Sequence, residues 1–330
     1  LTGENMFKLL KNEIIKILKR KNIYILLLIG ILIMLGYNFY CKYSNIKVDI
    51  KQQYEKAYKQ DEMYLQNYDS LETDEKYSDI VERVALEKYA IENNIEYNIL
   101  LNTENKNAIM PTDARIALMR VFNNFDIIIV IIIIYIASTI ILEEYTGGTI
   151  KSLLAKPHKR STIVFAKISI SIGIGLVVAI CIIIFQYIIG GVIFGFESYQ
   201  LEAIRYNHMT GNIEITNLLY YMIRIFICKL PMYISIMLIA LLLGVITSNV
   251  AINILICLGT YLISKGYILY NTITKYFLIY NWDISIYIFG DMPNLSSSSI
   301  TQAITISLMN IVIIFGLLVY IFKNKEVKNI

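Results

Sequence analysis

The sequence predicts an all-α integral membrane protein with six transmembrane helices. Its 330 residues are 56% hydrophobic, and several stretches of about 16 or more residues contain almost no charge. Helices of such length can cross the hydrocarbon core of a bilayer, whereas a lone strand would leave its backbone groups unpaired in lipid. One long polar region, residues 42–124, interrupts this pattern. We predict that it forms a mostly helical extracellular domain.

Six apolar stretches are assigned as the transmembrane helices. They are residues 23–41, 125–142, 163–196, 218–247, 250–270 and 300–322. The fourth stretch is interrupted by Arg224, Lys229 and Pro231, and a charge at the centre of a bilayer is costly. We therefore expect 218–230 to be an interfacial segment and 231–247 to be the span itself.

The distribution of charge predicts the orientation in the membrane. Six Lys or Arg residues stand against two acids in 1–22, four against two in 143–162, and three against one in the tail 323–330. The positive-inside rule therefore places both termini and the 143–162 loop in the cytoplasm. We expect a multi-pass protein of the cell (cytoplasmic) membrane. The regions expected outside are 42–124, 197–217 and 271–299.

Residues 1–22 are predicted to contain an amphipathic helix at the cytoplasmic surface. Its apolar side is expected to carry residues that recur at helical spacing, while lysines lie towards the other side. These apolar residues are Phe7, Leu10, Ile14 and Ile17. Such a helix lies in the membrane interface with its lysines near the lipid headgroups. The alternative interpretation is a charged cytoplasmic flank.

The 143–162 loop, EEYTGGTIKSLLAKPHKRST, is predicted to contain a second short helix. Thr149 can cap its start with the side-chain hydroxyl, and Pro157 ends it because a residue before proline is pushed out of the helical conformation. About two turns remain, with Ile150, Leu153 and Leu154 on one side. This pattern is typical of a small helix that lies along a membrane surface and offers an apolar ridge to the aqueous phase.

The order of residues in this loop resembles the first cytoplasmic loop of type-2 ABC exporter permeases. That loop has an acid at the inner end of span two, a Gly-Thr pair, a Leu-Leu pair, a proline, an arginine and a lysine in the next span. Here these are Glu143 or Glu144, Gly148-Thr149, Leu153-Leu154, Pro157, Arg160 and Lys167. The resemblance implies that the short helix, Ile150 included, is a coupling helix that fits a cleft on a separate ATPase subunit. The alternative is an ordinary basic loop.

The same resemblance carries expectations for two other segments. It implies that the helix in 1–22 is an elbow helix that also touches the ATPase, and that short re-entrant helices stand within 271–299. In the third span, Gln186 either lines a pathway or bonds to a neighbouring helix, and Gly191 and Gly195 have the spacing of a helix-dimer motif. The sequence alone leaves both roles of Gln186 open, and it leaves open whether the glycine spacing reflects a helix contact or chance.

The function implied by the resemblance is that of the membrane permease subunit of an ATP-driven ABC exporter. The chain has no G-x-x-x-x-G-K-[ST] phosphate-binding loop, so we expect it to bind no cofactor, with ATP and Mg²⁺ on the partner subunit. The expected partners are an ABC ATPase, a second permease copy or a homologous permease, and lipid, but no nucleic acid. An amphiphilic substrate is expected, such as a peptide antibiotic, drug or lipid-like molecule, which suggests a link to antibiotic resistance.

Two alternatives to a permease are a membrane sensor and an intramembrane enzyme. A membrane sensor of an extracellular peptide or drug, with no transport of its own, is compatible with the polar region. An intramembrane enzyme is suggested by the Glu143-Glu144 pair, but the sequence contains neither H-E-x-x-H nor G-x-S-x-G, and the two histidines fall in loops assigned to opposite sides. No catalytic or metal site is therefore predicted.

Overall fold

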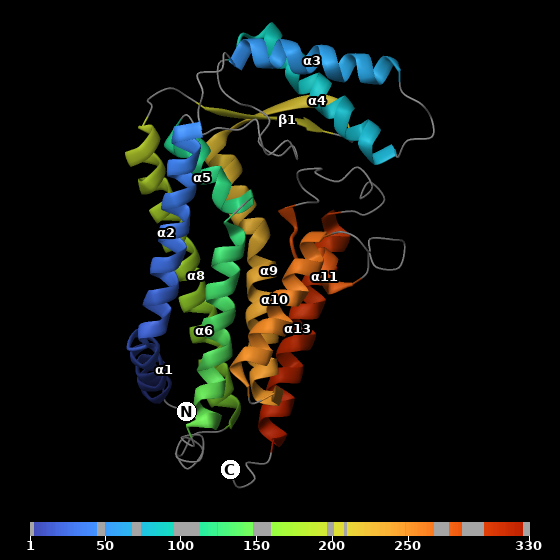
Figure 1. The fold of residues 1–330 in the computed structure, drawn as a ribbon. Helices are drawn as coiled ribbons and strands as arrows, with labels where there is room; N and C mark the ends of the chain where they lie inside the picture. The colour runs from blue at the N-terminus through green and yellow to red at the C-terminus, as the bar shows by residue number, and fades with distance from the viewer. Residues whose placement is uncertain are drawn as a thin grey trace.

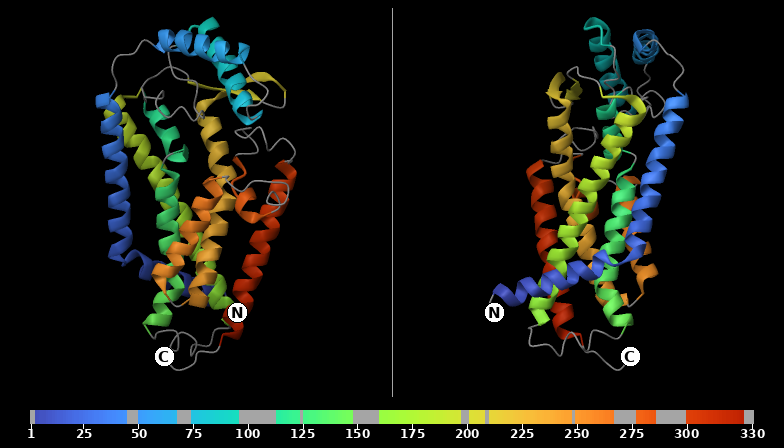
Figure 2. Two further views of the ribbon diagram at one scale, coloured as in Figure 1. Left: turned by 45° about the vertical axis from the view of Figure 1, so that its right-hand side comes forward. Right: turned by 90° about the vertical axis from the view of Figure 1, so that its left-hand side faces the viewer.

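The protein is a bundle of long helices with a small domain at one end (Figure 1). The computed structural model describes residues 3–44, 50–67, 74–95, 113–123, 125–147, 160–196, 201–207, 210–247, 249–266, 277–285 and 300–325. Helix α1 (Gly3–Leu18) lies across the opposite end of the bundle, where the last turn of α13 (Ile300–Asn324) is also found (Figure 2). This end is called the base.

Five helices of the described chain are long and apolar enough to cross a membrane. They are α2 (Lys21–Ser44), α6 (Asp126–Thr146), α8 (Arg160–Phe194), α9 (Leu218–Thr247) and α13. Helix α10 (Val250–Gly266) is also apolar but has 17 residues, or about 26 Å at 1.5 Å per residue. The described parts of the chain are helical apart from one hairpin, consistent with an all-α multi-pass membrane protein, and the number of six spans stays a prediction.

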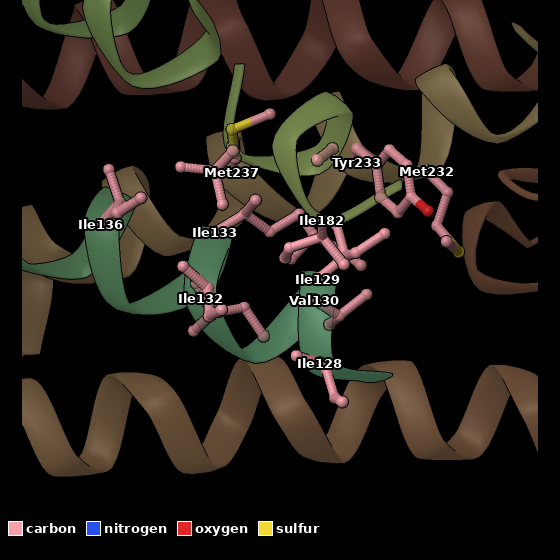
Figure 3. Packing of buried hydrophobic residues seen from close by; sticks show 14 of the residues in the cluster. Ile128, Ile129, Val130, Ile132, Ile133, Ile136, Ile182, Met232, Tyr233 and Met237 are labelled. Atoms are coloured by element: carbon pink, nitrogen blue, oxygen red, sulfur yellow. The ribbon is translucent and has the colours of Figure 1, made fainter. Parts of the chain in front are cut away.

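Helix α6 forms the centre of the bundle. Isoleucine side chains project from every side of this helix, and Ile129, Ile133 and Ile136 are completely buried. They meet Met237 and Tyr233 of α9 and Ile182 of α8 (Figure 3). A helix that is apolar all round is stable only when it is enclosed.

Helices α2 and α13 lie at the periphery and present apolar side chains outwards. Leu28 and Leu32 of α2 are 58% and 56% exposed, and Val312 of α13 is 68% exposed. A water-soluble protein rarely exposes apolar residues along whole helices, so these faces are suited to contact with lipid acyl chains.

The small domain at the far end, called the distal domain, combines two helices with a β-hairpin. Helices α3 (Ile50–Gln66) and α4 (Asp74–Glu92) pack on the strands β1 (Glu202–Asn207) and β2 (Asn212–Asn217) (Figure 1). Tyr54, Leu86, Ala90 and Ile204 form its own apolar core. Arg83 of α4 pairs with Asp61 of α3 at 2.7 Å and fixes the two helices together.

The hairpin is a feature that the sequence analysis did not predict in the 197–217 loop. The strands pair antiparallel with Arg205 opposite Glu214, and the turn uses Gly211 at a φ of +68°, a conformation that favours glycine. The available signal was the alternation of Ile213 and Ile215 with polar residues directly after that glycine.

Helix α5 (Ala114–Asn123) belongs to the bundle and not to the distal domain, which differs from the single domain predicted for 42–124. Ile116, Met119 and Val121 are almost completely buried among the membrane-spanning helices. The approach to α8 is close because Gly190 lies opposite Ala117, where an added Cβ would stand 2.8 Å from the alanine Cβ. Polar residues around 113–124 hid this short apolar helix in the sequence.

Helix α9 runs without interruption through Pro231, so the division into an interfacial segment 218–230 and a span 231–247 is not seen. The expectation rested on the cost of placing Lys229 in the membrane. Lys229 is instead 3% exposed and paired with two carboxylates, Asp126 and Asp283. Attraction to these carboxylates offsets part of the cost of burying the lysine charge.

The predicted dimer motif of Gly191 and Gly195 does not lie on one continuous helix. Helix α8 ends at Phe194, and Gly195 follows it with a φ of +98°. Its carbonyl accepts the N–H of Ala114 at 3.2 Å, which joins the end of α8 to the start of α5. A helix-packing motif needs both glycines on one helix face, so this arrangement does not support that interpretation.

Candidate functional site

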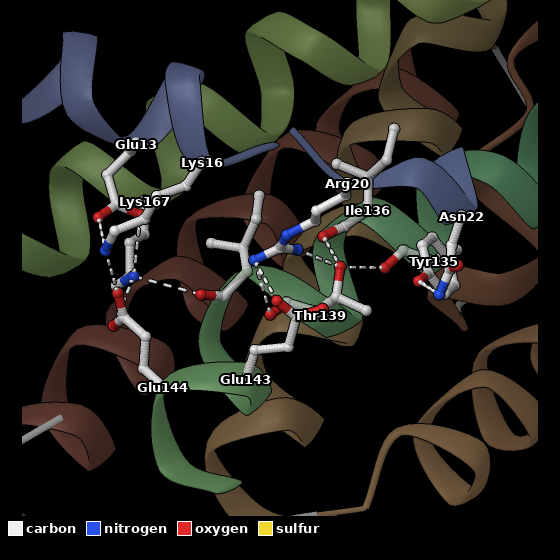
Figure 4. A network of polar contacts seen from close by, with 11 residues as sticks. Glu13, Lys16, Arg20, Asn22, Tyr135, Ile136, Thr139, Glu143, Glu144 and Lys167 are labelled. Carbon is white, nitrogen blue, oxygen red and sulfur yellow. Dashed lines mark hydrogen bonds and ion pairs between the residues drawn. The ribbon is translucent and has the colours of Figure 1, made fainter. Parts of the chain in front are cut away.

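A ring of four charged side chains joins three helices at the base (Figure 4). Lys16 Nζ lies 2.9 Å from a carboxylate oxygen of Glu13 and 3.0 Å from one of Glu144, while Lys167 Nζ lies 3.2 Å from Glu13 and 2.7 Å from Glu144. Each lysine therefore bridges both acids. The ring connects α1 with the last turns of α6 and the first turns of α8.

Local helix geometry explains how each member reaches the ring. Glu13 and Lys16 are three residues apart on α1 and so share one face, which also carries the buried Ile17. Glu144 stands two residues before the end of α6. Lys167, only 1% exposed, additionally donates to the Ile140 carbonyl of α6 at 3.2 Å. This bond fixes α8 against α6 independently of α1.

The ring is electrically balanced, with two acids and two bases, and burial makes that balance necessary. Burial alone would raise the pKa of Glu13, but the charge of Lys167 and the hydrogen bond from Lys16 outweigh it and hold the pKa below its usual value. Burial would lower the pKa of Lys16, but its hydrogen bonds to Glu13 and Glu144 raise the pKa instead. Both groups on α1 therefore stay charged at neutral pH.

A second set of contacts holds the turn between α1 and α2. Arg20 pairs with Glu143 at 2.8 Å and donates to the Thr139 hydroxyl at 2.6 Å, and that hydroxyl donates to the Tyr135 carbonyl. Asn22 donates to the Tyr135 phenol oxygen at 3.0 Å. The adjacent acids Glu143 and Glu144 thus pair with different side chains, Arg20 for the first and two lysines for the second. Helix α6 therefore contacts both α1 and the start of α2 (Figure 4).

Arg160, the first residue of α8, reaches the last turn of α13. Its guanidinium donates to the carbonyls of Lys323 at 3.0 Å and Lys325 at 3.2 Å. Lys325 in turn donates to the Val245 carbonyl near the end of α9. The carbonyls at a helix end lack partners within the helix, so this arginine acts as a cap supplied by a distant segment.

The structure brings together only some of the site residues predicted from sequence. Glu143 and Glu144 meet α1, and Arg160 meets α13. The predicted coupling residues Gly148, Thr149, Ile150, Leu153, Leu154 and Pro157 lie outside the described residues.

The predicted apolar side of α1 is partly different. Leu10 and Ile17 pack on the bundle core, but Ile14 is 39% exposed, and of Phe7 only its place in the helix is described. Glu13, which the apolar pattern did not predict, shares the buried face with Leu10 and Ile17. Its spacing of three from Leu10 and four from Ile17 was the available signal.

Gln186 of α8 lies in a buried polar contact. Its amide exchanges hydrogen bonds with Asn38 of α2 at 3.1 and 3.3 Å and donates to the Ala117 carbonyl at 2.9 Å. Asn38 also donates to the Met34 carbonyl within its own helix. All of these partners are protein groups, and they join α2, α5 and α8.

No metal site is evident in the described parts of the chain, where no group of three or more His, Cys, Asp or Glu side chains is placed to hold an ion. The four cysteines are free thiols. The charged contacts at the base hold α1 to the two helices that flank residues 148–159.

The fold and its apolar helices define a multi-pass membrane protein. The model of one protein family, described as ABC-2 family transporter protein, matches residues 7–327. The chain therefore belongs to the ABC-2 transporter family and is a membrane permease of an ABC transporter. Such a permease is the transport component, without catalytic activity of its own, and an ABC ATPase is its implied partner. Searches of curated proteins and of solved structures gave no match.

Proposed function

We propose that this permease exports an amphiphilic molecule, driven by ATP hydrolysis on a separate ATPase subunit. The observation that carries the proposal is the four-charge ring, because it joins α1 to both helices that flank residues 148–159. In this proposal the segment contains the coupling helix and α1 is the elbow helix. The ATPase then contacts α1 and the segment between the two helices that the ring joins to α1.

The contacts at the base support transmission of movement from such a partner. Helix α6 ends at Thr146 and α8 begins at Arg160, so a displacement of the intervening segment acts on both helices. Lys167 connects these helices to each other and to α1, and Arg160 extends the connection to α13. ATP can drive the change only if the ATPase binds one conformation of the permease better than the other.

The base faces the cytoplasm in this proposal, as the basic residues of 1–22 and 143–162 favour. Cysteine introduced at Ser70 is expected to react with an impermeant thiol reagent on intact cells, and cysteine at Ser152 only after permeabilisation. The native cysteines are replaced in the control. The reverse pattern of labelling contradicts the orientation.

An amphiphilic substrate suits a permease whose pathway is walled by apolar helices. Two aromatic residues of the region expected outside, Tyr280 and Trp282, are 7% and 1% exposed and therefore offer little surface to a substrate. Support for the substrate class therefore rests on the apolar character of the bundle. We expect a second permease copy or a homologous permease to complete the pathway, because the expected six spans supply half of one.

The proposal is tested by recovering the tagged chain from its membrane and measuring the ABC ATPase that accompanies it. Leu153→Asp is expected to lower ATPase recovery at least about tenfold, which corresponds to 1.4 kcal/mol of binding free energy. Ser152→Asp is the matched control, because it adds the same charge on the polar side of the predicted helix. Amounts of membrane-inserted chain are compared first.

Two outcomes contradict parts of the proposal. Wild-type recovery of the ATPase with Leu153→Asp shows that the assignment of the coupling helix is wrong. An intact wild-type chain that carries no ATPase contradicts ATP-driven transport and favours the alternative function, a membrane sensor of an extracellular peptide or drug.

A further inference from the structure

A second cluster of charges is buried in the half of the bundle nearer the distal domain, away from the base. Lys229 of α9 lies 3.2 Å from Asp126 at the start of α6 and 2.9 Å from Asp283, which follows the short helix α11 (Leu278–Asn281). Lys265 of α10 lies 3.4 Å from each of the same two carboxylates. The hydroxyls of Tyr233 and Tyr261 donate to the Asp126 carboxylate at 2.6 and 3.3 Å, so the cluster joins four elements.

The segment 281–285 is held in this cluster by more than charge. All five of its residues are buried, and Ser285 donates to the Asp283 carboxylate from both its backbone N–H and its hydroxyl. The N–H of Ile284 donates to the Cys228 carbonyl of α9 at 3.2 Å. A backbone carbonyl has two lone pairs, so the Cys228 carbonyl can accept this bond from outside its own helix.

The accepting carbonyl lies in the turn of α9 that precedes Pro231. Proline has no N–H to donate, so it leaves the carbonyl four residues earlier, that of Ile227, without its usual helical partner, and its ring crowds the same turn. Cys228 and Lys229 are neighbours in this turn, which places the accepting carbonyl beside the lysine that pairs with Asp283.

We propose that Lys229 is a positioning residue that locks segment 281–285 onto the turn of α9 that contains Cys228 and Lys229. The lock consists of the Lys229–Asp283 pair and the Ile284–Cys228 backbone bond, side by side. Asp126 and Lys265 complete the charge balance, since the cluster holds two acids and two bases. Lys229 is the lysine that α9 contributes, and its side chain is 4% exposed. Lys265 comes from α10, its side chain is 33% exposed, and it pairs with the same carboxylates at longer distances.

The lock matters for movement of the outer half of the bundle. With it closed, segment 281–285 and the α9 turn must move as one unit with the start of α6. Opening it frees the segment from α9. Its part in a transport cycle rests on the proposed export function, but the lock itself does not, and its test needs neither ATP nor a partner subunit.

Two electrically neutral double variants separate the lock from simple charge burial. Lys229→Met with Asp283→Asn removes the bridge between α9 and the segment. Asp126→Asn with Lys265→Met also removes one acid and one base but keeps the bridge. A role in charge balance alone predicts the same behaviour for both, whereas the lock predicts that they differ.

The measurement is hydrogen exchange of the backbone amides of residues 278–285 in the purified full chain, followed by mass spectrometry. We expect exchange at Ile284 to rise at least about tenfold in the first double variant, because local opening controls exchange, and to stay near wild type in the second. Equal exchange in the two variants overturns the proposal.

A single variant provides a second test if the first double variant is not recovered in folded form. Asp283→Asn keeps Lys229 paired with Asp126 and leaves the excess positive charge on Lys265, which reaches solvent. Exchange at Ile284 is expected to rise in this variant too. Exchange at the wild-type rate contradicts the lock.

Discussion

Glu87 is expected to make the distal domain less stable as the pH rises. Its side chain lies on α4, the residue is 2% exposed, and one carboxylate oxygen has no hydrogen-bond partner in the described structure. Burial raises the pKa of the Glu87 carboxyl from 4.5 to about 8, the negative charge of Asp61 adds to the rise, and Arg83 opposes it. The folded domain therefore prefers the protonated acid.

The sign and size of the effect follow from linkage between folding and protonation. A pKa that is raised on folding gives stability that is complete below the unfolded pKa of 4.5 and is lost as the pH rises towards 8. The loss between pH 5 and pH 8 is about 3 kcal/mol, at 1.36 kcal/mol for each pKa unit. We expect Glu87→Met to remove this dependence, because methionine fills a similar volume and carries no ionisable group.

Amide exchange of α4, compared between wild type and variant at each pH, tests this expectation. The ratio of exchange rates is expected to grow about a hundredfold from pH 5 to pH 8, with the wild type less protected at the higher pH. Glu92→Met, which removes an exposed carboxylate from the end of the same helix, is the control. A constant ratio for Glu87→Met refutes the reasoning.

Two further predictions concern the bundle. Lys167→Met leaves an excess buried negative charge at the base and is expected to lower the free energy of unfolding by about 3 kcal/mol, measured by thermal unfolding in detergent. Adding Glu144→Gln to the same chain is expected to recover at least half of this stability. A double variant that is no more stable than Lys167→Met alone contradicts the ring. Gly190→Ala is expected to destabilise the bundle by about 1–3 kcal/mol, because the new Cβ would stand 2.8 Å from that of Ala117, whereas Gly173→Ala meets nothing within 4 Å and is expected to be near neutral.

Five of the predicted apolar stretches coincide with helices long and apolar enough to cross a membrane, because their signal is local. Each span is a run of apolar residues whose length is set by the bilayer, as α6 and α13 illustrate. Glu144 and Lys167 were also picked out from the order of residues around the 143–162 loop, and the structure brings them together at 2.7 Å. Their third partner, Glu13, was missed because the helical pattern was traced through apolar residues alone.

The remaining differences depend on contacts between distant segments. A lysine in an apolar stretch is costly when alone, and nothing near Lys229 in sequence indicates that Asp126 and Asp283 will surround it. Helix α5 is similarly defined by the surface of α8 that receives it at Gly190, more than 60 residues later in the chain. Local patterns give the elements, whereas the partners of buried polar groups depend on the assembled bundle.

The polar contacts along α2 have a mechanical consequence. Its start is joined to α6 through Asn22 and Tyr135, and towards its other end Asn38 bonds to Gln186 and Lys42 donates to the Ile193 carbonyl at 2.8 Å. Helices α2 and α8 are thus pinned along the half nearer the distal domain, where sliding of one past the other would break two sets of bonds. The two helices are therefore expected to move as one rigid body, so that a tilt imposed at the base is transmitted to the end of the bundle nearer the distal domain.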